Sequence, residues 1–170
     1  DKIRDYGCNR SILAVYYDYK LDSLRGDMAI DRLTLRNNLA TQQTEFQKLA
    51  VEVRRNPLIK PLDHLNAPEV SIITGVRRCG KSTYLRQLAL EIPSDATWYF
   101  IDFESPDLDG LTLKELPTLY DLLIELTPPR NGRLIFLLDE IQVVPGWEKW
   151  VRSLAQDRKN KVFITGSNSS

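Results

Sequence analysis

The sequence has 170 residues, of which 23 are basic and 23 acidic, so the formal net charge is zero. A balanced charge argues against a protein whose overall field attracts nucleic acid or an anionic membrane. Hydrophobic residues make up 42% of the sequence, a share typical of folded globular proteins, and the length suits one compact domain with an extension.

The sequence gives little indication of a membrane span, a signal peptide or disulfide bonds. The apolar runs are far shorter than the roughly 18 residues of a membrane span, and no apolar stretch follows the charged start Asp1–Tyr6. The two cysteines, Cys8 and Cys79, lie far apart, which argues against a disulfide framework. We therefore expect a cytoplasmic protein that does not bind membranes.

The N-terminal part is expected to differ from the rest. Residues 1–34 form an extension of uncertain structure, in which Ser11–Tyr19 fits either a strand or a helix. Apolar residues at helical spacing predict a helix over Arg32–Arg54, and three prolines then indicate a connector. We assign residues 35–68 to this helix and connector, and residues 69–170 to the core domain.

Strands and helices alternate in the core domain. The predicted strands are Val70–Thr74, Thr97–Phe103, Leu134–Leu138 and Lys161–Thr165, and the predicted helices are Lys81–Ile92, Leu113–Leu126 and Trp147–Ala155. Strongly apolar strands are buried on both faces, as in a parallel sheet covered by helices. The order predicts an α/β fold, a three-layer αβα sandwich with a mostly parallel sheet.

A glycine-rich motif follows the first predicted strand and reads Gly75-Val76-Arg77-Arg78-Cys79-Gly80-Lys81-Ser82. It matches a phosphate-binding loop, in which glycines let backbone N–H groups wrap an anion at a helix N-terminus. Lys81 is then expected to bind the β and γ phosphates of a nucleoside triphosphate. The Ser82 hydroxyl is a hard oxygen ligand for Mg²⁺. Thr83 is expected to reach the α-phosphate.

The variable positions of this loop carry less information. Arg77 and Arg78 could contact phosphate, a partner or nucleic acid, but we favour solvated loop residues. Cys79 is expected to be a small residue that fits. Nucleic-acid binding has little support, because short basic pairs such as Arg54-Arg55 are usually surface residues and no stacking aromatic side chains alternate with them.

Two acids follow the third strand. The carboxyl ends of parallel strands meet at one edge of a sheet, so Asp139 and Glu140 are expected close to the phosphate-binding loop. Asp139 would hold Mg²⁺, and Glu140 would act as the general base on the attacking water. The alternative is a solvated strand end. The role of Gln142 is left undecided, and Glu104 fits a solvated turn better than a group that steers the base.

These motifs together resemble a group of prokaryotic AAA-type P-loop ATPases, known mainly as ATP-binding proteins, which usually carry a poorly characterised C-terminal domain. The resemblance covers about Leu35 to Ser170 and is carried by Ile73–Thr83, Ile101–Glu104, Leu138–Gln142, Pro145–Val151 and Ile164–Ser169. It implies ATP as the nucleotide, with Mg²⁺. It also implies that Asn168, or next Ser167, is the first sensor of the γ-phosphate. Without the resemblance, a turn rich in serine and asparagine would explain these residues.

Members of that group continue beyond the first sensor to a fifth strand, an arginine finger and a second sensor. We therefore expect this chain to be the truncated N-terminal part of a longer ATPase, with weak or absent turnover. The fifth strand lies beside the first in that group. Val70–Thr74 is then expected to be an exposed sheet edge, open to self-association or to a partner protein, and the missing C-terminal domain is a second possible contact.

Three functions follow from these expectations. The first is MgATP hydrolysis coupled to conformational change, and the second is a nucleotide-gated switch or scaffold with little turnover. The third is a DNA-associated motor or an accessory ATPase of a nuclease. A kinase is disfavoured, because Glu140 beside Asp139 indicates water as the acceptor.

Overall fold

The structure is a computed structural model. It describes residues 30–48, 64–65, 67, 69–130 and 133–167. The predictions for Ser11–Tyr19, for the helical residues after Lys48 and for Asn168 lie outside these residues.

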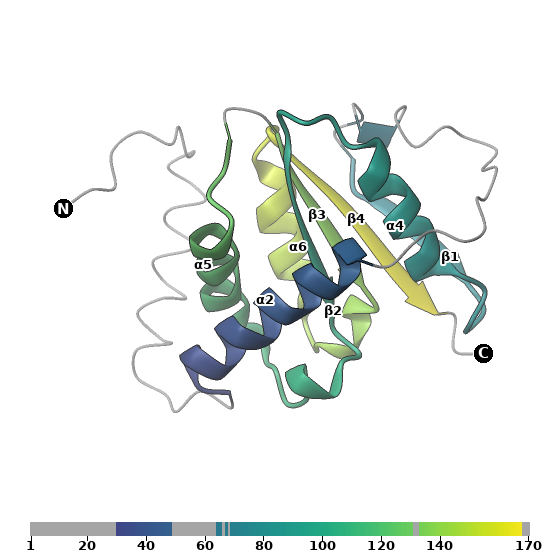
Figure 1. Ribbon diagram of the computed structural model, residues 1–170. Helices are drawn as coiled ribbons and strands as arrows, with labels where there is room; N and C mark the ends of the chain where they lie inside the picture. The colour runs from purple at the N-terminus through teal and green to yellow at the C-terminus, as the bar shows by residue number, and fades with distance from the viewer. Residues whose placement is uncertain (1–29, 49–63, 66, 68, 131–132, 168–170) are drawn as a thin grey trace.

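The described elements follow the predicted order (Figure 1). The helices are α2 (Arg32–Lys48), α4 (Lys81–Glu91), α5 (Leu116–Leu126) and α6 (Trp147–Gln156), with 3₁₀ turns η1 (Pro106–Leu108), η2 (Leu113–Glu115) and η3 (Ile141–Val143). The strands are β1 (Ser71–Gly75), β2 (Thr97–Asp102), β3 (Leu134–Asp139) and β4 (Asn160–Ser167). The helix predicted from Leu113 begins one turn later, because η2 precedes α5, and Pro117 lies in the first turn of α5 as expected.

The four strands form one sheet in the order β1-β4-β3-β2, and every pairing is parallel. Side chains alternate between its faces. One buried cluster joins a face of the sheet to α5 and α6, and a second cluster joins the other face to α4 (Figure 1). The predicted α/β fold with a parallel sheet and flanking helices is therefore confirmed.

Helix α2 closes the edge of the sheet formed by β2. Its residues Leu35 and Leu39 are buried in the first cluster, and Phe46 is buried in the second, so the helix spans both faces. Two glutamines of α2 bond to the strand backbone. Gln43 accepts from the N–H of Phe100 at 2.9 Å, and Gln42 accepts from the N–H of Asp102 at 2.9 Å. These side chains take the place of a neighbouring strand.

Strand β1 forms the opposite end of the described sheet order, where it pairs with β4. Its Ile72 side chain is 63% exposed. Self-association through this edge stays a prediction, as does the division into residues 1–34, 35–68 and 69–170. Among the described helices, none has the length and apolar character needed to cross a membrane.

Candidate functional site

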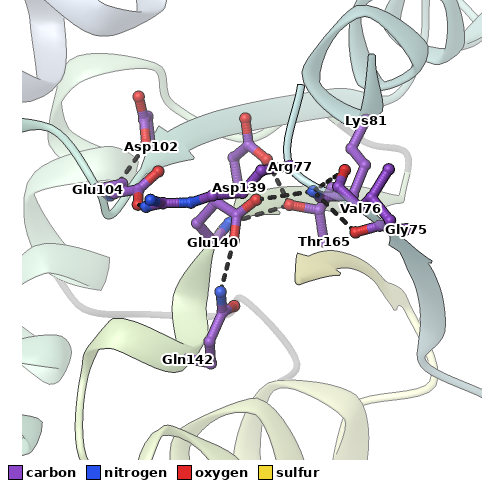
Figure 2. A network of polar contacts seen from close by, with 10 residues as sticks. All are labelled: Gly75, Val76, Arg77, Lys81, Asp102, Glu104, Asp139, Glu140, Gln142 and Thr165. Carbon is purple, nitrogen blue, oxygen red and sulfur yellow. Dashed lines mark hydrogen bonds and ion pairs between the residues drawn. The ribbon is translucent and has the colours of Figure 1, made fainter. Parts of the chain in front are cut away.

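Polar side chains from four parts of the chain gather at the carboxyl end of the sheet (Figure 2). The register explains this, because β1, β2, β3 and β4 run in the same direction and end at the same edge. The loop after β1 approaches the acidic end of β3, and Thr165 comes from the last residues of β4.

The loop between β1 and α4 folds tightly around small residues. A Cβ atom at Gly75 would lie 2.7 Å from the Cys79 Sγ atom, so a side chain at this position would displace the cysteine thiol. Gly80 adopts a φ of 91° and Arg78 a φ of 61°, both in the left-handed region. Gly80 is the residue before α4, and no side chain caps that helix end in the described structure. The first-turn N–H groups are thus suited to an anion.

Lys81 begins α4 and extends back into the site. Only 6% of its surface is exposed. Its Nζ atom lies 3.3 Å from the Gly75 carbonyl oxygen, 3.4 Å from that of Val76 and 3.0 Å from Glu140 Oε1 (Figure 2). The ammonium group is therefore held between the loop backbone and the acidic end of β3.

Thr165 links β4 to both acids. Its hydroxyl donates to the buried carboxylate of Asp139 at Oδ1, and its oxygen accepts from the N–H of Glu140 at 3.0 Å. Glu140 has a φ of 52° and a ψ of 37°, an uncommon left-handed conformation for a residue with a Cβ atom. Such local strain concentrates at functional sites, where the surrounding contacts hold it. Thr165 supplies one of those contacts.

Gln142 contacts the second oxygen of the Glu140 carboxylate, since its Nε2 atom donates to Oε2 (Figure 2). The amide of Gln142 also lies against the end of β4. A Cβ atom at Gly166 would come within 3.2 Å of Gln142 Oε1. The glycine therefore leaves the room that this amide occupies.

A further pair links the loop to β2. The Arg77 guanidinium forms an ion pair with Glu104, just beyond β2. Asp102 stands opposite Asp139 in the strand register. Burial, with a smaller contribution from the charges of Asp139, Glu104 and Glu140, raises the pKa of Asp102 above its ordinary value, although the Glu104 N–H opposes this shift.

The structure brings together five of the predicted site residues, namely Gly75, Val76, Lys81, Asp139 and Glu140 (Figure 2). Ser82 and Thr83 are half-buried in the first turn of α4. Of the variable loop residues, Val76 and Arg78 are exposed, Cys79 packs behind Gly75, and Arg77 turns to Glu104.

Sequence reasoning missed two parts of the site. Thr165 was read as the end of an apolar strand, although a polar residue there is a signal for a contact at the sheet edge. Glu104 lies in an exposed turn, as expected, but the sequence gives no sign of its ion pair with Arg77. The first contact depends on β4 lying beside β3, and the second on the loop after β1 reaching across the sheet to the end of β2.

Comparison with known proteins identifies the family to which this chain belongs. Residues 67–170, more than half of the chain, match a family of AAA domains. The chain belongs to this AAA domain family. A protein of Haemophilus influenzae, described only as uncharacterized, is 31% identical over 121 residues, which cover 69% of this chain and 30% of that protein. The chain thus spans about a third of that relative's length. No solved structure matches the chain significantly.

Membership of the AAA domain family implies nucleotide binding, in general of ATP with Mg²⁺. The residues present fit that ion. Ser82 and Asp139 offer hard oxygen atoms. Among the described residues, no group of three or more His, Cys, Asp or Glu side chains could hold a metal ion by itself. Mg²⁺ typically keeps several waters and binds one or two protein oxygens together with substrate phosphates.

Proposed function

We propose that this AAA domain binds MgATP and hydrolyses it, and that the nucleotide state is coupled to conformational change. The observation that carries the proposal is the contact between Lys81 Nζ and Glu140 Oε1 at 3.0 Å. It brings a lysine expected to bind phosphate to the acid that would activate water, from the start of α4 and the end of β3, which are far apart in the sequence.

Each side chain then has a role. The loop N–H groups and Lys81 bind the β and γ phosphates, which a flexible ammonium group suits. Ser82 and Asp139 would hold Mg²⁺, which neutralises phosphate charge when bound. Thr165 fixes the orientation of Asp139, and Glu140 accepts a proton from the attacking water. Asn168 is proposed to contact the γ-phosphate.

The variant Glu140→Gln tests the assigned base. An amide of the same shape cannot accept the proton, so we expect turnover to fall by roughly 100-fold or more while MgATP still binds. The matched control is Glu148→Gln, at an exposed position of α6. Turnover by Glu140→Gln at the wild-type rate would show that another group activates the water.

A nucleotide-gated switch with little turnover is the second candidate. The Lys81–Glu140 contact favours it, because phosphate oxygens that bind Lys81 compete with the carboxylate and so change the contacts made by the acidic end of β3. Tight MgATP binding by a wild-type protein without measurable hydrolysis would support the switch over the ATPase. The DNA-associated function gains nothing from Arg77, whose guanidinium is engaged by Glu104.

A further inference from the structure

The carboxylate of Glu140 is contacted on both of its oxygens by side chains with different properties. Lys81, a full positive charge, lies 3.0 Å from Oε1. Gln142, a neutral amide, donates to Oε2 from the 3₁₀ turn η3 that follows the acid (Figure 2). The carboxylate plane is therefore defined by two donors that come from different elements.

Nucleotide binding would affect these two hydrogen-bond donors to Glu140 differently. Lys81 is the phosphate ligand of the proposed function, so phosphate oxygens would compete for its ammonium group. The contact of Gln142 involves no atom that the phosphates need. Gln142 is thus placed to keep the orientation of the base when Lys81 turns to its substrate.

A neutral amide suits this task. A general base must lie within hydrogen-bond reach of the proton that it accepts, and a misplacement of about 1 Å can cost roughly 100-fold in rate. A cation at position 142 would also neutralise the carboxylate. An amide orients the group and leaves its charge available.

The place of the amide is itself fixed by β4. Gln142 Oε1 and Cδ lie over Gly166, where an added Cβ atom would approach to 3.2 Å and 3.7 Å. Thr165, the residue before this glycine, binds the backbone N–H of Glu140 at 3.0 Å. The end of β4 therefore locates both the backbone of Glu140 and, through Gln142, its side chain.

We propose that Gln142 is a positioning residue, which holds Glu140 in place for attack of water on the γ-phosphate. This inference rests on the proposed ATPase function. It assigns no contact between Gln142 and the reacting atoms.

The test compares two substitutions in the full chain with ATP and Mg²⁺. Gln142→Met keeps the length of the side chain and its packing against Gly166 but removes the donor, and Gln142→Ala removes both. We expect kcat to fall roughly 10-fold or more in each variant, with the Kd for MgATP unchanged, because the lost interaction acts on the base alone. Gln156→Met, at an exposed position of α6, is the matched control and should keep the wild-type kcat.

The outcomes separate the two proposals. A wild-type kcat in Gln142→Met, together with loss of turnover in Glu140→Gln, would overturn the positioning role and leave the ATPase intact. A weaker Kd with unchanged kcat would also overturn it, because Gln142 would then serve nucleotide binding. Absence of hydrolysis in the full-length wild-type protein would overturn the ATPase proposal and the positioning role with it.

Discussion

Lys81 and Glu140 form an ion pair with an N–O distance of 3.0 Å between the first turn of α4 and the residue after β3. The side chains are only 5% and 12% exposed, so the pair is shielded from solvent screening. The two residues that the sequence assigned to phosphate binding and to water activation therefore contact each other directly. A nucleotide that engages Lys81 must change the surroundings of Glu140.

This competition predicts a change in affinity. In Glu140→Gln the amide attracts Lys81 less than a carboxylate does, so the ammonium group is more available to phosphate. We expect the Kd for MgATP to decrease by about 3- to 10-fold, equivalent to roughly 1 kcal/mol. Isothermal titration calorimetry beside the exposed-site control Glu148→Gln would measure it. A weaker Kd in Glu140→Gln alone would contradict the competition.

Thr165→Val should loosen the acidic end of β3. Valine has nearly the same shape, but it cannot donate to Asp139 or accept from the N–H of Glu140. Both groups then lose a partner in a buried region, and we expect the free energy of unfolding to fall by about 1–3 kcal/mol. Denaturant unfolding would show this loss. Thr44→Val, at an exposed site of α2, is the control and should change stability much less.

Asp102→Asn should stabilise the protein near neutral pH. Because burial raises the pKa of folded Asp102, the folded state holds this proton more tightly than the unfolded chain does. The contribution of the carboxyl to stability is therefore full below pH 3.8, its ordinary pKa, and is lost as the pH rises through the raised value. Asparagine has no such loss and keeps an acceptor for the Glu104 N–H.

The measurement is chemical denaturation of wild type and Asp102→Asn at several pH values without added metal. The difference in the free energy of unfolding should be positive near neutral pH and should shrink towards zero below pH 3.8. A difference that does not depend on pH would mean that repulsion and burial of the Asp102 charge do not destabilise the fold.

Gln43→Ala should expose the edge of β2. The glutamine accepts from the Phe100 N–H at 2.9 Å and donates to the Trp98 carbonyl at 3.3 Å. Loss of this side chain should lower the free energy of unfolding by about 1–2 kcal/mol. It should also leave backbone N–H and C=O groups of β2 open to another strand, so the variant should aggregate more readily. Gln47→Ala, on an exposed part of the same helix, is the control. Equal stability of the two variants would contradict the edge-capping role.

The sequence predicted those parts of the fold that depend on local pattern. Gly75, Gly80 and Lys81 mark the turn from β1 into α4, and the apolar run before Asp139 marks β3, because each signal is contained in a few neighbouring residues. The parallel direction of the strands then places Lys81 and Glu140 at the same edge.

Other features depend on tertiary register, and no local pattern carries them. The contacts of Gln42 and Gln43 with the backbone of β2 require α2 to lie along that strand. The partnership of Thr165 with Asp139 requires β4 to lie beside β3, and that of Arg77 with Glu104 requires the loop to reach towards the end of β2. The order of the strands and the packing of α2 against β2 decide these contacts, and both depend on the whole fold.

The most direct test of the account is equilibrium binding of MgATP to the wild-type chain beside Lys81→Ala, with Lys114→Ala as a control at an exposed lysine. We expect micromolar binding by the wild type and by Lys114→Ala, and a loss of roughly 100-fold or more in Lys81→Ala, because the main cation for the β and γ phosphates is removed. Equal binding by all three folded proteins, or no binding by the folded wild type, would contradict the assignment of this loop as the phosphate site.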